Sequence, residues 1–281
     1  KRQGKFSTDI GRQALSWGQG IVFQSLDVFN PFAPASIDTE YKTGQDMALI
    51  SYSYDLNTQI NALLVPRRDV ISHDFESDKS SFVLRVQKRF EGTSYETQAI
   101  IAKHFDEPMI GLGISTTLLE SVIRFDFALF DPDQGNLIPQ AIINMDRSWE
   151  AFGINWYGYL EYFYSGSGTS SSNYSDLSER LLKKLEQGEL FTLAENYLTT
   201  GFKQEITPLI NLYELVILNL DDNSTLSQLK LTYDLTPNFT ILSALTFGLG
   251  ASGDEFQSLK LLNGGLLGRG DSFLLQGNYY F

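Results

Sequence analysis

The residues that could act on a solute are charged side chains at alternate positions of otherwise apolar segments. In residues 81–90, for example, Arg85 and Arg89 alternate with Phe82 and Leu84. A period of two places successive side chains on opposite faces of a β-strand. One face would be apolar and the other would carry charges of both signs, which can filter solutes. The predicted charged face contains Asp55, Arg67, Arg85, Arg89, Arg124, Asp126, Glu161, Lys230 and Asp234, and the same alternation extends it to Asp9, Asp146 and Glu214.

Hydrolytic chemistry has little support in this sequence. It would need a nucleophile held by a base, and the two histidines, His73 and His104, lie in no recognisable serine–histidine motif. The acidic segment 74–78 is more typical of a solvated surface loop. We therefore expect no catalytic residues and no enzyme activity.

Cofactor, metal and nucleic-acid sites are also not expected. Asp131 and Asp133 resemble the start of a calcium loop, but residue 142 is Ile where the closing Glu would stand. Gly111 and Gly113 are not followed by a phosphate-binding helix. The chain has no cysteine, which excludes cysteine-ligated metals, and its net charge of −13 disfavours nucleic acid as a partner.

The elements that would position these charges are about fourteen strands in one antiparallel sheet. The predicted strands are residues 4–13, 46–56, 58–68, 81–90, 94–104, 109–119, 121–130, 139–149, 155–164, 192–204, 208–220, 228–235, 239–249 and 271–281. Their connections alternate between short turns and long loops, which favours a single domain over residues 1–281 rather than two. The long connections are predicted at 14–45, 69–80, 131–138, 166–190, 221–226 and 250–270.

The loop over residues 166–190 is predicted to contain a short helix. In Ser175 to Gln187, the residues Leu177, Leu181 and Leu185 have helical spacing, and Gly188 follows as a stop signal. We place this helix outside the sheet, over or beside the mouth of a pore. A simple exposed helix without a gating role fits the same residues.

The last eleven residues resemble the closing strand of a bacterial outer-membrane β-barrel. Gly277, Tyr279 and Phe281 lie on one side of an alternating segment that ends on an aromatic residue. Lipid cannot satisfy unpaired backbone groups, so the terminal strand of such a barrel must pair and close the sheet. The resemblance therefore implies a transmembrane antiparallel β-barrel.

A second resemblance lies near the start of the chain. Gly11-Arg12-Gln13, then Trp17-Gly18 and Asn30-Pro31, resemble a segment of porin-like outer-membrane barrels related to the alginate-export family. Arg12, Gln13, Trp17 and Asn30 are the predicted constriction motif. Either this segment pins a long loop to the barrel wall, or residues 14–45 fold inward and narrow the pore.

These resemblances imply a channel in the Gram-negative outer membrane, for passive or partner-assisted passage of small solutes or of one specific substrate. The implied partners are outer-membrane lipid, lipopolysaccharide and small solutes, together with periplasmic partners if the barrel works in an export assembly. The alternative is a non-conducting barrel that serves as an anchor or docking component. A hydrophobic fraction of 42% also fits a soluble β-sandwich. The charged face could also form salt bridges that fill a closed interior.

Overall fold

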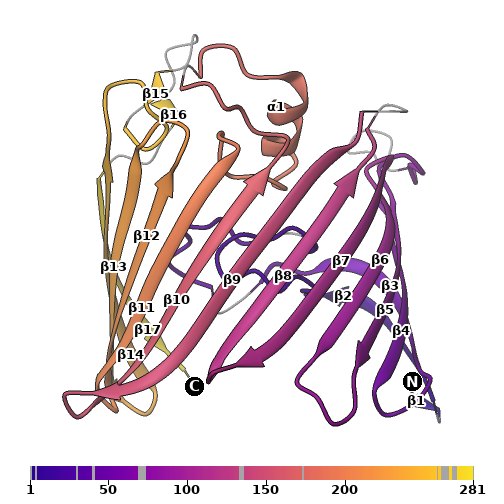
Figure 1. The fold of residues 1–281 in the computed structure, drawn as a ribbon, viewed down its shortest axis with the longest axis horizontal. Helices are drawn as coiled ribbons and strands as arrows, with labels where there is room; N and C mark the ends of the chain where they lie inside the picture. Colours follow the sequence, from indigo (N-terminus) through magenta and orange to yellow (C-terminus); the bar gives the residue numbers. More distant parts are fainter. Residues whose placement is uncertain are drawn as a thin grey trace. The chain divides into compact units, whose positions relative to one another are not determined.

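The computed structural model consists almost entirely of β-strands joined by turns and loops (Figure 1). It describes residues 2–3, 5–29, 31–39, 42–68, 74–132, 136–172, 174–257, 259–260, 266–267 and 271–280. The long strands are β2 (Phe6–Gln13), β3 (Gln45–Ser53), β4 (Thr58–Val65), β5 (Ser81–Arg89), β6 (Glu96–His104), β7 (Glu107–Leu118), β8 (Ser121–Phe130), β9 (Ile138–Ala151), β10 (Ile154–Ser165), β11 (Asn196–Thr207), β12 (Ile210–Asn219), β13 (Thr225–Thr236), β14 (Phe239–Leu249) and β17 (Ser272–Tyr279). The short elements are β1 (Arg2–Gln3), β15 (Leu259–Lys260), β16 (Leu266–Leu267) and the helix α1 (Glu179–Glu186).

The prediction of an all-β chain with about fourteen antiparallel strands is confirmed. The strand order of the main sheet follows the chain from β1 to β14 and ends with β17, while β15 and β16 pair with each other. The predicted closing strand is present as β17, which pairs with β14. Among the described residues no pairing joins β17 to β1 or β2, and Phe281 lies outside them. Closure through Gly277, Tyr279 and Phe281 stays a prediction.

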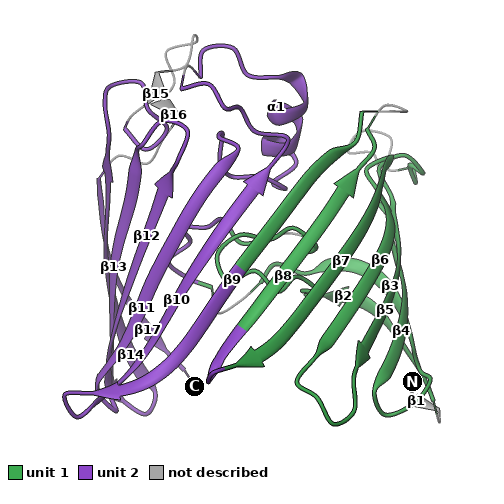
Figure 2. Cartoon of the chain, in the orientation of Figure 1, with its two compact units in different colours: residues 1–32, 39–118, 123–143 green, residues 33–38, 119–122, 144–281 purple. Residues whose placement is uncertain are grey.

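The chain divides into two compact units (Figure 2). Unit 1 comprises Lys1–Phe32, Thr39–Leu118 and Ile123–Ile143, and unit 2 comprises Ala33–Asp38, Leu119–Val122 and Asn144–Phe281. Most of the long loop between β2 and β3 thus belongs to unit 1, but its central residues belong to unit 2.

Most of the long strands have one buried and one exposed face because their side chains alternate. In β5 of unit 1, Val83 and Arg85 are buried, whereas Phe82 and Leu84 are 52% and 40% exposed. In β10 of unit 2, Glu161 is buried and its neighbour Leu160 is exposed. The exposed face is apolar and the buried face carries polar groups, which is the reverse of a soluble sheet packed on a hydrophobic core.

Several of the short connections, those at residues 105–106, 119–120 and 152–153, are tight turns with left-handed backbone. Leu119 and Glu120 join β7 to β8 with φ values of 49° and 65°. Two successive positive φ values are the mark of a type I′ turn, whose twist matches that of the flanking strands. The turn between β9 and β10 repeats this geometry at Phe152 and Gly153. The turns therefore set the register of each hairpin.

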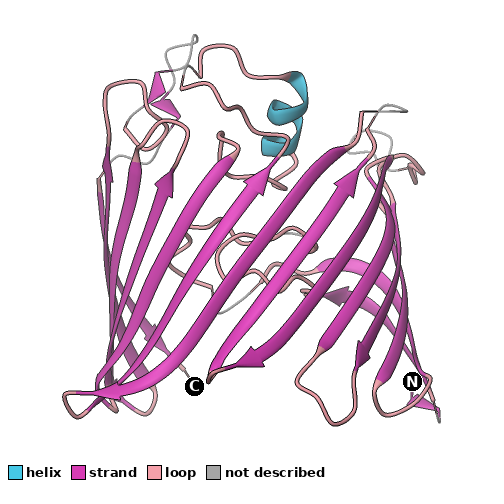
Figure 3. Ribbon diagram, viewed as in Figure 1, coloured by secondary structure: helices cyan, strands magenta, loops and turns pink. Residues whose placement is uncertain are grey.

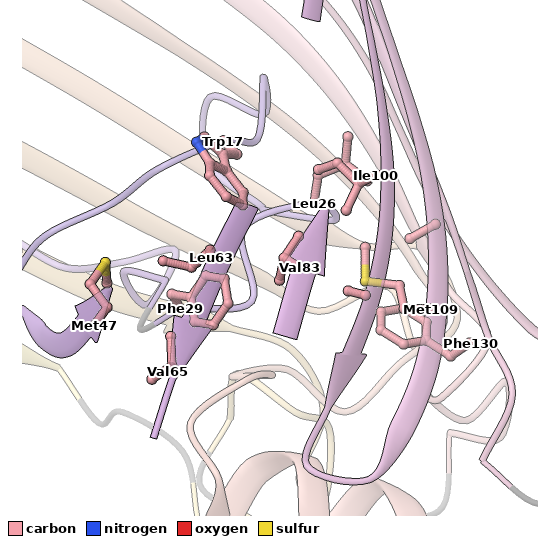
Figure 4. Packing of buried hydrophobic residues seen from close by; sticks show 12 residues of the cluster. Trp17, Leu26, Phe29, Met47, Leu63, Val65, Val83, Ile100, Met109 and Phe130 are labelled. Carbon is pink, nitrogen blue, oxygen red and sulfur yellow. The ribbon is translucent and has the colours of Figure 1, made fainter. Parts of the chain in front are cut away.

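A hydrophobic cluster of unit 1 lies between its strands and the loop that follows β2 (Figure 4). Trp17, Leu26 and Phe29 of this loop are 8%, 2% and 3% exposed. Their partners on the strands are Met47, Leu63, Val65, Val83, Ile100, Ala102, Met109, Ala128 and Phe130. The loop is thus bound to the buried face by apolar side chains, each of which contributes about 1.5–3 kcal/mol when fully buried.

The helix α1 lies in the loop between β10 and β11 (Figure 3). It begins later than the sequence predicted, because Ser178 has extended backbone and its hydroxyl accepts a hydrogen bond from the Leu181 amide at 3.2 Å. This is an N-cap, so Ser175, Asp176 and Leu177 lie before the helix. Leu181 is fully buried. In the described part of the chain, no helix has the length and apolar character needed to cross a membrane.

We expect Phe29→Ala to lower the free energy of unfolding by about 3 kcal/mol, because it leaves a cavity between the loop and the strands. Urea titration of the detergent-solubilised protein measures the change. Leu56→Ala, in the fully exposed turn after β3, is the control and should have no measurable effect. Equal stability of the two variants would contradict a loop held by its buried side chains.

Candidate functional site

Two polar side chains of unit 1 bind the backbone of the loop that follows β2. The Gln98 amide on β6 donates a hydrogen bond to the carbonyl of Trp17 at 2.8 Å. The Asp126 carboxylate on β8 accepts one from the amide of Gln19 at 2.6 Å. Gly113 leaves room for both, since a Cβ there would lie 2.7 Å from Asp126 and from Gln98. The loop backbone therefore has hydrogen-bond partners on the buried face, as a buried polar segment requires.

Arg85 joins this contact between strand and loop. Its Nε donates to Gln98 at 2.9 Å, one terminal nitrogen lies 3.4 Å from Asn61, and its guanidinium carbon lies 5.4 Å from the centre of the Trp17 ring. The structure thus brings together Arg85, predicted on the charged face, and Trp17, predicted in the loop motif. Gln98 and Asn61 were not predicted from the sequence as members of this site. Their polar side chains at alternate positions of otherwise apolar strands were the signal that could have identified them.

A buried ion pair connects the middle of the same loop to its end. The Lys42 ammonium contacts the Asp27 carboxylate, and the two side chains are 9% and 4% exposed. Lys42 also donates to the carbonyl of Leu15 at 2.5 Å and to the hydroxyl of Ser16 at 2.8 Å. Burial raises the pKa of Asp27 above its usual value, and Lys42 acts in the opposite direction. Residues 15–42 are therefore closed on themselves as well as bound to the sheet.

In unit 2 the central residues of the loop bind β13. The Gln228 amide donates to the carbonyl of Ala35 at 3.0 Å, and the Lys230 ammonium donates to the carbonyl of Ile37 at 3.2 Å. Gln228 and Lys230 share one face of β13, since they are two residues apart. As in unit 1, strand side chains bind the carbonyls of the loop.

A second lysine shares an aromatic partner with Lys230. The ammonium groups of Lys203 and Lys230 lie 5.8 and 4.7 Å from the centre of the Tyr213 ring, and the three residues are cross-strand neighbours on β11, β12 and β13. Lys203 also lines an open depression of about 390 Å³. The remaining residues of this depression are Ser148, Trp149, Asn155, Trp156, Tyr157 and Glu205.

The acidic groups on the buried face of unit 2 lie on β9 and β10. Glu161 is fully buried and accepts a hydrogen bond from the Asn144 amide at 3.1 Å. Asp146 accepts one from the Tyr157 hydroxyl at 2.7 Å. The buried face of unit 2 therefore presents carboxylates on β9 and β10 and ammonium groups on β11 and β13.

The other predicted charges lie toward the strand ends. Arg124 is half-buried on the same face of β8 as Asp126, and Arg67 follows β4, where it donates to Ser81 at 2.5 Å. Arg89 is exposed and pairs with Glu96 at 3.0 Å.

Two further predicted residues lie near the short turns. Asp234 accepts from the Thr240 hydroxyl at 2.6 Å, and Asp55 lies in the turn after β3, where it accepts from the Asn57 amide at 2.8 Å. The prediction for Glu214 is wrong. It pairs in register with Leu229 on the exposed face, because Leu215 and Ile217 occupy the opposite face of β12.

The residues of the predicted motif have different environments. Arg12 forms an exposed ion pair with Asp46 at 3.0 Å, at the end of β2. Gln13 is half-buried and pairs in register with Gln45, and Trp17 is buried in the cluster of unit 1. Asn30 lies outside the described residues.

A serine–histidine contact is present that no motif indicated, since its members are far apart in sequence. The Ser81 hydroxyl lies 2.7 Å from Nδ1 of His104. Both side chains are 1% exposed, and the imidazole packs edge-on against Phe29 at 5.4 Å. A buried pair beneath the loop is not open to a substrate, so we assign it a packing role.

Comparison with known proteins identifies structures with a similar fold. No family model matches the chain, and no curated protein matches it in sequence. Solved structures do match over its whole length. One of them is OccK10 (OpdN) of Pseudomonas aeruginosa, with 11% identity, a TM-score of 0.57 and coverage of 100% of this chain and 81% of that chain.

The fold is that of the Occ and OprD outer-membrane porins. Two further structures of Pseudomonas aeruginosa agree. OccK2 (OpdF) in complex with glucuronate has 9% identity and a TM-score of 0.52, with coverage of 100% of this chain and 80% of that chain. OpdK with vanillate has 10% identity and a TM-score of 0.51, with coverage of 90% and 74%. At these identities the similarity concerns the fold alone. It gives no support to the resemblance between the Gly11–Pro31 motif and the alginate-export family.

We expect Lys42→Met to lower the free energy of unfolding by about 3–5 kcal/mol, because the Asp27 carboxylate would remain buried without its cation. Urea titration in detergent at neutral pH is the measurement. Arg12→Gln removes the exposed ion pair at the end of the same loop and should leave the stability unchanged, because exposed pairs are worth little. Similar losses in both variants would show that burial of the Lys42–Asp27 pair is not what matters.

Proposed function

We propose that this protein is a passive channel in the outer membrane of a Gram-negative bacterium. The observation that carries this proposal is the buried face of strands in a porin fold, whose polar side chains bind the loop after β2 within unit 1 and bind residues 33–38 within unit 2. Small solutes would pass along this face. The short turns, except the one at Phe105 and Asp106 between β6 and β7, would lie at the periplasmic end. That turn and the long loops, including residues 166–190 with α1, would lie at the extracellular end.

The exposed face supports placement in a membrane. In unit 1 it presents large apolar side chains that water would disfavour and lipid would accept. They include Ile50, Leu64, Phe82, Leu84, Ile101, Ile110 and Leu112. In unit 2, Trp149 and Trp156 stack with ring centres 6.1 Å apart beside the turn that joins β9 to β10. Tryptophan concentrates where hydrocarbon meets the headgroups. Outer-membrane lipid and lipopolysaccharide would then surround the strands.

The loop of residues 14–44 is the proposed constriction. Within unit 1, Trp17, Gln19 and Phe29 bind the strands. Within unit 2, the carbonyls of Ala35 and Ile37 bind β13. A loop that is held at several points would narrow the channel permanently and would not act as a moving gate. Arg85 and Asp126, which hold it, would then control the width as well as the charge of the path.

The solute class we favour is small organic anions. OccK2 is a structure with glucuronate and OpdK one with vanillate. In this chain, Lys203 and Lys230 flank Tyr213 on the buried face. Two ammonium groups beside an aromatic ring suit a solute with a carboxylate and an apolar body. Two observations favour transport over catalysis. The fold is one found in channels that are not enzymes, and the Ser81–His104 pair is buried away from any substrate.

Conductance in planar lipid bilayers tests the channel. We expect discrete current steps from the purified protein, and larger steps after deletion of residues 20–40, because the deletion removes Leu26 and Phe29 and with them the constriction. A protein that gives no current, and gains none after the deletion, would contradict an open pore. That outcome would instead favour a non-conducting barrel with an anchor or docking role.

Lys230→Gln should shift the reversal potential in a salt gradient toward cation preference, since it removes a positive charge from the proposed path. Recording in planar bilayers supplies the readout. Lys88→Gln, on the exposed face of β5, removes the same charge outside the path and should leave the reversal potential unchanged. Equal shifts in both variants would argue against Lys230 as a lining residue.

A further inference from the structure

A buried carboxylate holds together the long loops of unit 2. Glu255, in the loop after β14, is 5% exposed. Its carboxylate accepts hydrogen bonds from the Leu193 amide at 2.7 Å, the Tyr197 hydroxyl at 2.5 Å and the Asn219 side-chain amide at 2.8 Å. Leu193 lies in the loop that contains α1, Tyr197 lies at the start of β11, and Asn219 ends β12. One side chain thus connects three separate segments.

A second carboxylate, that of Asp222, extends this network. It accepts from the Glu255 amide at 2.8 Å and from the Tyr174 hydroxyl at 2.9 Å. Tyr174 accepts in turn from Asn219 at 2.8 Å. The loop residues before α1, the connection after β12 and the loop after β14 therefore converge on the same few polar groups.

The groups that face Glu255 are neutral or acidic. They are the phenols of Tyr174 and Tyr197 and the carboxylate of Asp222, and a further acidic pair, Asp221 and Glu195, lies beside Asn196. Among the described residues no cation contacts the Glu255 carboxylate. Two basic side chains of α1 have partners outside this network, since Arg180 donates to Ser167 and Lys184 pairs with Glu189.

This environment favours the protonated form of Glu255. The pKa of Glu255 is raised from its usual 4.5 to about 7. Burial is the largest cause and the nearby Asp222 adds to it, and together they outweigh the hydrogen bonds from Tyr197, Leu193 and Asn219, which lower the pKa. If the loops separated, Glu255 would be solvated and its pKa would return toward 4.5. The joined loops therefore bind the proton more tightly than the separated loops do. Their junction is most stable below pH 4.5 and loses stability as the pH rises toward 7.

We propose that Glu255 is a proton-dependent clamp, which keeps the α1 loop, the end of β12 and the loop after β14 joined in mild acid and releases them near neutral pH. The junction itself follows from the contacts within unit 2. Its effect on solute passage rests on the proposed channel function, because these loops would then lie at the extracellular mouth. Release of the loops would raise access to the channel as the medium becomes less acidic.

Hydrogen exchange measured by mass spectrometry tests the clamp in the intact protein in detergent micelles. The amides of residues 190–195 and 250–257 are followed at pH 5.0 and 7.5, with protection factors corrected for the intrinsic pH dependence of exchange. We expect protection to fall at least roughly tenfold at pH 7.5, because one pKa unit corresponds to a factor of about ten in the opening equilibrium. Equal protection at the two pH values would overturn the clamp.

Two variants identify the group that titrates. Glu255→Gln removes the ionisable carboxyl, so protection of these segments should no longer depend on pH. Glu186→Gln, in which α1 loses a carboxylate that takes no part in this network, makes the same charge change and should keep the wild-type dependence. A pH dependence that persists in Glu255→Gln would overturn the proposal.

Asp222→Asn replaces Glu255→Gln if the latter does not fold. The negative charge of Asp222 raises the pKa of Glu255, so its removal lowers that pKa toward the value in the separated loops. The fall in protection between pH 5.0 and 7.5 should therefore become smaller than in the wild type. An unchanged fall in Asp222→Asn would likewise overturn the clamp.

Conductance separates the clamp from the channel. If the protein conducts, loop-related current fluctuations should increase between pH 5.0 and 7.5 in the wild type and stay constant in Glu255→Gln. A protein that does not conduct but loses protection at pH 7.5 would retain the clamp and refute the channel. A conducting protein with pH-independent protection would retain the channel and refute the clamp.

Discussion

The backbone hydrogen bonds between neighbouring antiparallel strands are the constraint on which the rest of this structure depends. These bonds pair the backbone N–H and C=O groups within the plane of the sheet, so the side chains on its two faces can differ in chemistry. Because side chains alternate, Leu84 and Arg85 can be adjacent in sequence and face opposite environments. The exposed face is therefore apolar, while the buried face can combine polar side chains such as Arg85 with the apolar cluster that holds the loop after β2.

The long loop after β2 is not part of the sheet, so its backbone amides and carbonyls need hydrogen-bond partners other than the backbone of a neighbouring strand. Side chains from the sheet supply the partners: Gln98 and Asp126 in unit 1, Gln228 and Lys230 in unit 2. Burying polar groups is costly unless they are paired. The same residues that hold the loop therefore cannot be replaced by apolar ones without releasing it, which links the position of the proposed constriction to its charge.

The two kinds of connection have different tasks. The short turns, such as that at Leu119 and Glu120, fix strand register through backbone conformation alone. The long loops of unit 2 are held by side-chain networks instead, with Glu255 as their common acceptor. Networks of buried polar groups respond to protonation, whereas backbone turns do not. Regulation would therefore be found in the long loops.

The sequence by itself determined the all-β class and the approximate positions of the fourteen strands, because a period of two is a local property of the chain. It also indicated the helix, although not the Ser178 cap that shortens it. Only the tertiary structure decided which distant residues meet, such as Trp17 with Gln98 and Glu255 with Leu193, and it corrected the face of Glu214. Those contacts depend on the register of paired strands and on where long loops fold, and neither is encoded in local periodicity.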